Sequence, residues 1–496
     1  MEQTIRFFGV AKSPSGERWA RNFGQPPLRP EWRTDLHDFT IYCFEEIGNE
    51  QTNMNERVVL FFYLMLGICM EFPWLAVKFW LMDDYGVSIA SVGAILSTVS
   101  LPWCLKPLWG YISDNYPIAG RRRKPYIILC NVGISALWVL LASSPHSETG
   151  VTGILLAVST LTCFSDVLYD AAMVGISQTE HVTKSGSYQS LCWTFRSLGS
   201  FVAAVAAGFL LETVKPTQIF GIESGLPIVV MLGACFMYEK AESGEENQVR
   251  TAQRANWRKV LESMRDPKLW KPAVFVCAFA LTPGSGNAWF YYLVEEHGFT
   301  PKVMGGLTCV RHGSMLAGTL IYRRWLREVP FRRFFVCLVL LSSLLSLTPL
   351  LLFYKVNSAF GIPDLFFVAG DDVFLAAIGQ IAMMPCLILV AKLCPEGVEA
   401  SLYATFVALI NFSGIASDYL SSSLTWYIGV TYTDFEKLPV LIVVCAATSL
   451  LPLLCIKHLP PGTVMELERK ENRKRPAKLD EAYLNELVGL TSEESA

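Results

Sequence analysis

Charged residues are scarce in this chain of 496 residues: Asp, Glu, Lys and Arg make up 17% of it, against about 25% in ordinary soluble domains. A chain with so few charges and 52% hydrophobic residues cannot cover a soluble surface, which excludes a soluble enzyme. The net charge is −3 and the basic residues are scattered among loops. This pattern excludes a nucleic-acid binder, because such proteins concentrate positive charge on one surface.

Motifs for catalysis and for metal binding are also lacking. The 14 cysteines form no CxxC pair, and all but Cys43 lie within or beside apolar runs, which favours packing residues over a disulfide or metal framework. HExxH and GxSxG are absent and the six histidines are scattered, which argues against a membrane-embedded enzyme. We therefore predict no catalytic residues, no metal ligands and no cofactor. Residues 1–57 have no apolar stretch, so we expect no cleavable signal peptide.

The chain has long apolar runs instead. About 20 residues cross a bilayer as a helix, and only helices or closed barrels can satisfy every backbone group in lipid. The runs are continuous and lack the alternation of barrel strands. We therefore predict an all-α membrane protein with twelve transmembrane helices, at residues 58–82, 88–113, 125–143, 151–178, 186–211, 218–239, 271–294, 301–326, 331–354, 372–395, 399–428 and 437–458.

The basic residues predict the orientation in the membrane. If the N-terminus is cytoplasmic, the inner loops hold 19 Lys and Arg and the outer loops hold four. Cytoplasmic loops carry such an excess, so we expect a multi-pass protein with both termini in the cytoplasm. A plasma membrane is favoured over an organelle membrane. A receptor is disfavoured, because the number of spans is even and the two halves look duplicated.

A short repeat supports two halves of six helices each. SLCWTFRSL (190–198) and SLYATFVAL (401–409) match at five of nine positions and lie at the same place in each half. Parallel repeats with a site between them are the plan of major facilitator transporters. The predicted regions are a cytoplasmic tail (1–57), the N-terminal half (58–239), a cytoplasmic linker (240–270), the C-terminal half (271–458) and a second cytoplasmic tail (459–496).

Several ionisable side chains fall inside the predicted spans. Such a group costs about 3 kcal/mol at the bilayer centre, so it faces a cavity or a partner. Asp166 and Asp170 are four residues apart and share one helix face. Arg196 in the fifth span lies as deep as Asp166, and Lys106 in the second lies as deep as Asp170. We expect the pairs Asp166–Arg196 and Asp170–Lys106.

These charges allow two interpretations. They are either salt bridges that hold the N-terminal half together, or groups that bind an anionic substrate and carry a coupling proton. In the second case the two aspartates and Glu71 are the candidates for proton coupling. Trp193 and Arg311 would add substrate contacts, Arg311 from the C-terminal half. Lys78 and Asp418 lie further out, and we expect them to snorkel towards the interface.

The seventh span, FALTPGSGNAWFYYL (279–293), carries helix-breaking residues at its middle. Broken helices at this depth commonly line substrate cavities. Asn287 and Tyr291 would then offer an amide and an aromatic face to the substrate. A simple packing kink is the alternative.

The loop after the second span resembles the major facilitator loop signature, although it is several residues longer. Its elements here are Gly110, Asp114, Arg121 and Arg122. The resemblance implies a role in gating the inner side. Basic anchoring at the membrane would explain the arginines equally well.

Longer motifs identify a family. The chain resembles the folate–biopterin transporter family of the major facilitator superfamily in PWCLKPLWGYISDNYPIAGRRRKPY (102–126), SDVLYDAAMV (165–174), SLCWTFRSLGS (190–200), ALTPGSGNAWFYY (280–292) and AKLCPEGVEASLYATF (391–406). This resemblance implies uptake of folates or biopterin, commonly with protons, and charged residues at positions 106, 166, 170 and 196. One departure is Gly175, where family members often carry an acidic residue.

The prediction is therefore a secondary active transporter of folate, biopterin or related pterin-type anions, working by alternating access with H⁺ as the coupling ion and surrounded by membrane lipid. Lys106, Asp166, Asp170, Arg196, Trp193, Arg311, Asn287 and Tyr291 are the predicted substrate-binding residues. The alternative is a major facilitator transporter of another organic anion, an amino acid or a drug-like solute.

Overall fold

The computed structural model describes residues 50–143, 147–177, 187–239, 265–326, 328–393 and 399–463. The chain divides into two units, residues 1–53 and 54–496, and the account below concerns the second. Its described residues are helical, with β-pairing limited to two isolated bridges. Nine helices in this part of the chain are long and apolar enough to cross a membrane.

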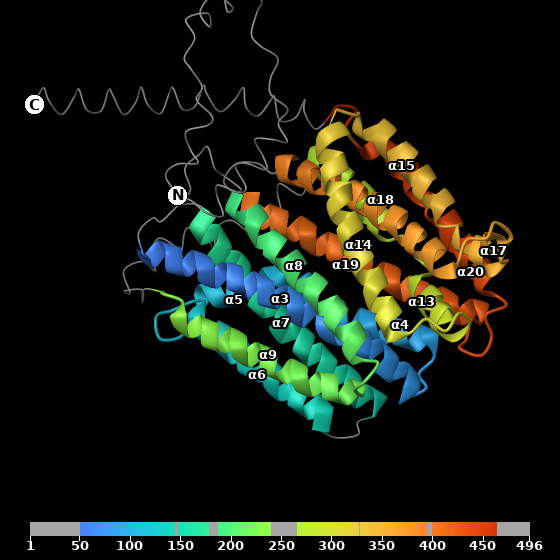
Figure 1. Cartoon of the computed structure of the whole chain (residues 1–496). Coiled ribbons are helices and arrows are strands. Elements are labelled where there is room, and N and C mark those ends of the chain that lie inside the picture. Colours follow the sequence, from blue (N-terminus) through green and yellow to red (C-terminus); the bar gives the residue numbers. More distant parts are fainter. Residues whose placement is uncertain are drawn as a thin grey trace, which may run out of the picture. The chain divides into compact units, whose positions relative to one another are not determined.

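The N-terminal half is a bundle drawn in blue to green in Figure 1. Helices α6 and α9 run side by side along it. Its elements are α3 (Glu50–Asp83), α4 (Ile89–Ser100), the 3₁₀ helix η2 (Leu101–Leu105), α5 (Lys106–Asn115), α6 (Lys124–Ser143), α7 (Glu148–Ser177), α8 (Ser187–Leu210) and α9 (Pro216–Phe236).

The C-terminal half is drawn in yellow to red. Its elements are α12 (Pro267–Ala280), α13 (Gly286–Glu295), α14 (Pro301–Ile321), the π-helical η6 (Tyr322–Leu326), α15 (Phe331–Leu345), α16 (Pro349–Phe353), α17 (Val356–Ala359), α18 (Asp364–Leu393), α19 (Glu399–Ile428), α20 (Leu438–Thr448) and the 3₁₀ helix η7 (Leu451–His458).

Helix lies at each of the twelve predicted spans, so the predicted all-α fold is confirmed. One boundary was wrong, because α18 begins at Asp364 and not near residue 372. In the sequence, Asp371 and Asp372 look like the polar end of a helix. In the structure they lie within α18, where Thr348 donates a hydrogen bond to Asp371 and Arg311 donates one to Asp372. The predicted linker up to residue 264 and most of both predicted tails lie outside the described residues.

The predicted break in the seventh span is present, between α12 and α13. The backbone groups that the break releases find partners on α19. The N–H of Gly284 donates to Oγ of Ser421 at 2.9 Å, and Oγ of Ser417 donates to the carbonyl of Thr282 at 2.6 Å. Unsatisfied backbone groups are costly in lipid, so these two serines stabilise the break.

A second interruption, where η2 separates α4 from α5, was not predicted, although Pro102 and Pro107 in the sequence indicate it. Proline lacks an N–H and disrupts the helical hydrogen bonds of the preceding turn. The carbonyl of Pro102 accepts hydrogen bonds from Nε1 of Trp109 at 3.2 Å and from the thiol of Cys163 at 3.4 Å. Lys106 is the first residue of the helix that restarts here.

The two halves share buried apolar cores at only one end of the described bundle. We call this the 84–88 end, after the loop between α3 and α4, and the opposite one the 116–123 end, after the loop between α5 and α6. At the 84–88 end, two clusters contain residues of both halves, such as Trp80 with Tyr291 and Phe79 with Leu293. At the 116–123 end, each half has a separate cluster.

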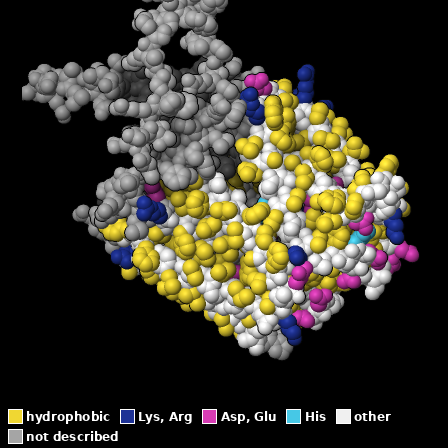
Figure 2. Space-filling model, in the orientation of Figure 1, with side chains coloured by type: hydrophobic (Ala, Val, Ile, Leu, Met, Phe, Trp, Pro, Cys, Tyr) yellow, Lys and Arg dark blue, Asp and Glu magenta, His cyan; other side chains and the backbone are white. Residues whose placement is uncertain are grey.

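Apolar side chains cover much of the visible surface, and charged ones gather at its margins (Figure 2). Large exposed residues include Phe236, Leu316, Leu344 and Phe366, each at least 65% exposed. A soluble monomer does not expose apolar area on this scale. The surface therefore fits a lipid environment.

Candidate functional site

The charged residues of the N-terminal half meet in one cluster, which we call the acid–base cluster: Lys106, Asp166, Asp170 and Arg196. Nζ of Lys106 contacts the carboxylate of Asp166 and lies 3.6 Å from that of Asp170. Nη1 of Arg196 lies 3.4 Å from the other oxygen of Asp166. Both expected pairs are therefore present, and the contact between Lys106 and Asp166 joins them into one network.

Burial differs within the acid–base cluster. The Asp166 side chain is fully buried, whereas that of Asp170 is 37% exposed and those of Lys106 and Arg196 are about one fifth exposed. A hydrogen bond also holds Asp170, donated by the hydroxyl of Tyr63 at 2.5 Å. Partly exposed charges deep in a transmembrane bundle face water, because a charge facing lipid is expensive.

Close contact between α3 and α8 positions Arg196. A Cβ atom on Gly67 would lie 2.0 Å from the backbone carbonyl oxygen of Arg196, so only glycine allows this approach. The guanidinium then reaches the sulfur of Met70 at 3.1 Å and lies over the ring of Trp193, 5.0 Å from its centroid. Trp193 is 49% exposed and offers the rest of its face to a ligand.

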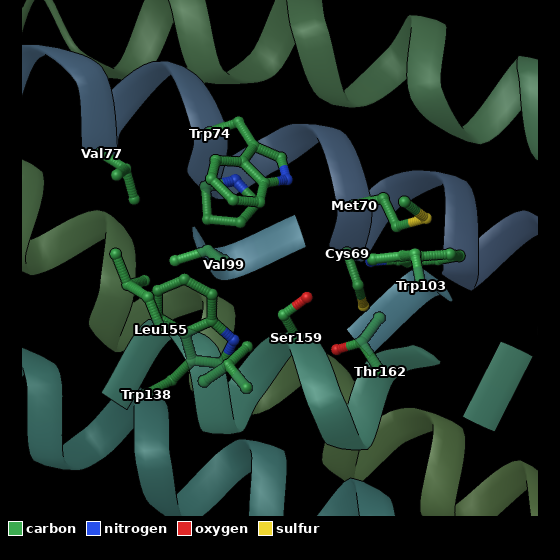
Figure 3. A pocket seen from close by; sticks show the side chains of 12 residues that line it. Cys69, Met70, Trp74, Val77, Val99, Trp103, Trp138, Leu155, Ser159 and Thr162 are labelled. Carbon is green, nitrogen blue, oxygen red and sulfur yellow. The ribbon is translucent and has the colours of Figure 1, made fainter. Parts of the chain in front are cut away.

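A cavity borders the acid–base cluster within the N-terminal half (Figure 3). Its volume is about 40 Å³, which is room for two or three water molecules at about 10–15 Å³ each. Met70 and Trp103 line it, and these residues contact Arg196 and Lys106. A drug-sized ligand needs several hundred Å³, so this cavity suits water and not a pterin.

A second set of charges lies between the halves, and we call it the interhalf group: Glu71, Lys78, Arg311, His312 and Asp372. Glu71 of α3 lies 3.6 Å from Nε2 of His312 of α14, and Arg311 lies 3.3 Å from Asp372. Glu71 follows directly after Met70, so the interhalf group adjoins the acid–base cluster.

The prediction that Lys78 snorkels outward was wrong. Its ammonium lies over the ring of Phe290, 4.7 Å from the centroid, and interacts electrostatically with Glu71 and Asp418. Cation–π contact with the other half holds the side chain inside. Span depth alone gave no indication of this, because it does not tell which way a helix face points.

Tyr291 and Asn287 lie in contacts between the halves. Tyr291 is only 1% exposed; its hydroxyl donates to the carbonyl of Lys78 at 3.3 Å, and its ring meets Tyr432 edge to face. Asn287 packs closely against Gly93 of α4: a Cβ atom added to Gly93 would lie 3.2 Å from the amide nitrogen of Asn287. Tyr291 is thus part of the buried core that the halves share at the 84–88 end.

The loop with the predicted signature is held by a residue that the sequence did not reveal. The carboxylate of Glu239 accepts hydrogen bonds from the backbone N–H groups of Arg122, Arg123 and Lys124, and so caps α6. An acidic group suits a helix N-terminus. The backbone of Arg122 and Arg123 therefore belongs to a helix cap, while their side chains add positive charge at this loop.

The other signature residues are close by. Gly110 packs α5 against Val167 of α7, and the carboxylate of Asp114 interacts electrostatically with Arg122. Arg121 pairs through its backbone with Ile118. The departure at Gly175 lies beside the guanidinium of Arg123.

Sequence reasoning missed Tyr63 and His312, which complete the acid–base cluster and the interhalf group. His312 follows Arg311 at the centre of α14, and an ionisable pair there was the available signal. Tyr63 gave none, since tyrosine is common in transmembrane helices. Among the described residues, no group of three or more His, Cys, Asp or Glu side chains could hold a metal ion.

Comparison with known proteins gives consistent matches. The sequence model of the BT1 family matches residues 66–478. A folate-biopterin transporter of Synechocystis sp. is 35% identical over 418 residues, covering 84% of each chain. Folate transporter 1 of Plasmodium falciparum is 28% identical over 387 residues, covering 78% of this chain and 76% of that protein.

Solved structures share the fold at low identity. The nucleoside transporter NupG superposes with a TM-score of 0.60 at 13% identity, covering 81% of this chain and 98% of that one. A bacterial homologue of the lysosomal transporter Spinster, in an inward-facing and occupied conformation, also gives 0.60 at 13% identity, covering 82% and 97%. These likenesses support the fold alone.

Proposed function

Because the chain belongs to the BT1 family, we propose that it is a secondary active transporter of folate, biopterin or related pterin anions. The relatives described above are named as folate or folate-biopterin transporters, so their class is transport and not catalysis. The chain is a multi-pass membrane protein. Proton coupling and alternating access are the finer parts of the proposal.

The observation that carries the proposal is the acid–base cluster. Two cations from two helices, each about one fifth exposed, contact the fully buried Asp166, and Asp170 beside them is 37% exposed. Charge-assisted pairs with carboxylates are strong and directional. A substrate carboxylate can therefore replace Asp166 as the partner of Arg196 without any new cation being needed.

The same cluster supports a coupling proton. Its two cations and two carboxylates balance, so an incoming anion leaves one uncompensated negative charge. Protonation of Asp166 or Asp170 removes that charge and frees Arg196 for the substrate. In this scheme, substrate and proton enter together because each lowers the electrostatic cost of the other.

The surrounding residues suit a pterin. A flat heterocycle needs an aromatic face, which Trp193 offers beside Arg196. The exposed oxygen atoms of Asp170 can accept hydrogen bonds from the amino and ring N–H groups of a pterin. Arg311, 55% exposed between the halves, would hold the negative tail of a folate.

The proposal for the transport cycle rests on the distribution of apolar cores. The halves share buried cores at the 84–88 end and have separate ones at the 116–123 end. We assign the 116–123 end to the cytoplasm because its loops carry the excess of basic residues. On this assignment we propose that the state is closed to the outside, and that the protein lies in a plasma membrane with both termini in the cytoplasm.

Uptake by purified protein in liposomes tests the proposal. The compounds are labelled folate, labelled biopterin and a labelled non-pterin dicarboxylate, each with and without an inward proton gradient. We expect uptake of folate or biopterin that unlabelled pterins compete for and that the gradient increases. Uptake of the dicarboxylate alone would contradict the proposal and indicate a transporter of another organic anion.

Asp166→Asn tests the coupling scheme in the same liposomes. The asparagine mimics a protonated Asp166, so residual folate exchange should vary less with pH than that of the wild-type protein. Glu148→Gln, at the exposed first turn of α7, is the matched control and should keep the wild-type profile. An unchanged pH profile in Asp166→Asn would eliminate Asp166 as the coupling residue.

A further inference from the structure

A second fully buried carboxyl group lies in the N-terminal half, on the opposite side of α3 and α7 from the space between the halves. Glu223, in the middle of α9, has no exposed surface. Neither of its carboxyl oxygens has a hydrogen-bonding N or O partner among the described residues. It lines a cavity of about 30 Å³, which is room for about two water molecules.

The groups that face Glu223 come from three helices and none carries a positive charge. The thiol of Cys69 faces it from α3, and Asn131 lines the cavity from α6. Ser165 and Tyr169 line it from α7. The remaining lining is apolar or hydroxylic: Leu66, Ile134, Trp138, Val158, Thr162, Pro227 and Val230.

An ionised carboxylate in such surroundings is very costly, because no cation among the described residues faces it and the few water molecules that the cavity can hold solvate a charge far less than bulk water does. The neutral acid costs far less and needs only a weak partner. Cys69 and Tyr169 are the titratable neighbours, and both are neutral at ordinary pH. Glu223 therefore carries its proton in the state seen here.

Glu223 and the acid–base cluster lie beside neighbouring cavities. The cavity at Glu223 and the cavity beside the cluster share four lining residues, Cys69, Trp138, Val158 and Thr162. Figure 3 shows Ser159 and Thr162 of α7 and Cys69 of α3 facing one another at this point. Met70 lines the second of these cavities and contacts Arg196, which in turn contacts Asp166.

A metal cation fits this place less well than a proton. Hard cations take about six oxygen ligands, whereas the described lining offers one carboxyl group, two hydroxyl groups, one phenol and one amide. The amide nitrogen of Asn131 is already directed to the hydroxyl of Tyr169 at 3.2 Å. One carboxyl group with room for water is the minimum that a proton site needs.

The geometry points to Glu223 as a proton-binding site of the transport cycle, connected to the acid–base cluster by water in the two cavities. In the step that we propose, the O–H bond of the Glu223 carboxyl group breaks and a water molecule in the cavity accepts the proton. Water then donates a proton to the carboxylate of Asp166, where an O–H bond forms. The reverse transfer returns the proton to Glu223. The inference rests on the proposed proton-coupled transport, and Glu223 itself touches no substrate.

Infrared spectroscopy of the purified full-length protein tests the site without any substrate. A protonated buried carboxyl group gives its own C=O stretching band, which we expect in the wild type at neutral pH and in the control Glu148→Gln. The band should be missing in Glu223→Gln. If that variant does not fold, the band should shift in Glu223→Asp. A band that both Glu223 variants leave unchanged overturns the assignment.

Transport measurements then test the role. With the membrane potential clamped at zero, one coupled proton allows about tenfold accumulation of folate per unit of pH gradient. Glu223→Gln should bring the accumulation ratio to about one, while exchange of labelled for unlabelled folate persists, because the amide keeps the shape of the acid. Gradient-driven accumulation that persists in Glu223→Gln contradicts the role. Accumulation driven by Na⁺ and not by H⁺ also contradicts it.

The two measurements separate this inference from the proposed function. If wild-type protein transports no pterin, yet the Glu223 band is present and another anion accumulates with protons, the proposed cargo fails and the proton site stands. If folate accumulates with protons in both the wild type and Glu223→Gln, the proposed function stands and the proton site fails.

Discussion

Asp166 and Glu223 are both fully buried carboxyl groups of the same six-helix half, yet their surroundings are opposite. Asp166 contacts Lys106 and Arg196, whereas Glu223 has only a thiol and neutral polar groups around it. Burial without a partner favours the neutral acid, and burial between cations favours the carboxylate. The comparison shows that one six-helix half holds two buried carboxyl groups in opposite surroundings, one between cations and one among neutral groups.

The largest expected effect is on stability and separates the two acids directly. Asp166→Asn removes the buried carboxylate from its contacts with Lys106 and Arg196 and leaves Lys106 with Asp170 only. Removing one member of a buried pair costs about 3–5 kcal/mol. Glu223→Gln replaces a neutral acid by an amide of the same shape and should cost about 1 kcal/mol or less. Unfolding midpoints of both purified variants at pH 7 measure the difference. A lower midpoint for Glu223→Gln than for Asp166→Asn would reverse our assignment of charge.

The tyrosine hydroxyl groups beside Asp170 and beside Glu223 should show a similar difference in stability on a smaller scale. Tyr63 donates to the charged Asp170, and a hydrogen bond to a charged group contributes about 1.5–3 kcal/mol. Tyr169, beside Glu223, accepts from the amide of Asn131, and a neutral bond contributes about 1 kcal/mol. Tyr63→Phe should therefore destabilise the protein more than Tyr169→Phe does, as judged by thermal unfolding. Equal losses would mean that Asp170 is neutral.

A double-mutant cycle sharpens the description of Asp166 as a counter-ion. Asp166→Asn with Arg196→Gln removes one charge of each sign and leaves Lys106 with Asp170. The double variant should be more stable than the sum of the single losses predicts, with a coupling energy of about 1 kcal/mol or more. Additive losses in thermal unfolding would show that the two groups do not interact.

The smallest expected effect concerns the contact between the halves. Glu71 and His312 are about 30% exposed, and exposed pairs contribute about 0–1 kcal/mol. Glu71→Gln should leave the unfolding midpoint nearly unchanged but alter the folate exchange rate by up to about fivefold, since about 1 kcal/mol corresponds to that factor. In the proposed transport cycle the two halves separate at this contact, so His312→Gln should have the same effect. A large loss of stability in either variant would make the pair structural.

The sequence was sufficient for the fold because continuous apolar runs in lipid leave little choice but helices. It also predicted the break at Pro283 and the two acid–base contacts, since matched depth limits which charges can meet. It did not predict that Lys106 contacts Asp166 as well as Asp170. These two carboxylates are one helical turn apart, and a long lysine side chain reaches both.

Other parts of the site depend on which way a helix face points, which depth does not reveal. The outward direction predicted for Lys78 was therefore wrong, since its side chain points inward to Phe290. The burial of Tyr291 between the halves was not predicted. Glu223 was missed because it is a single acid in a span without any charged neighbour at its depth. Only the packing of α3, α6, α7 and α9 around it reveals that it has no partner.

Equilibrium binding of labelled folate to the purified protein tests the central claim most directly, namely that the cations of the acid–base cluster bind the anion. We predict that biopterin competes with folate, and that Arg196→Gln lowers the affinity by at least tenfold, because a bond to a charged group contributes about 1.5–3 kcal/mol. The exposed Arg333→Gln should bind as the wild type does. Unchanged folate affinity in a folded Arg196→Gln protein would contradict the account.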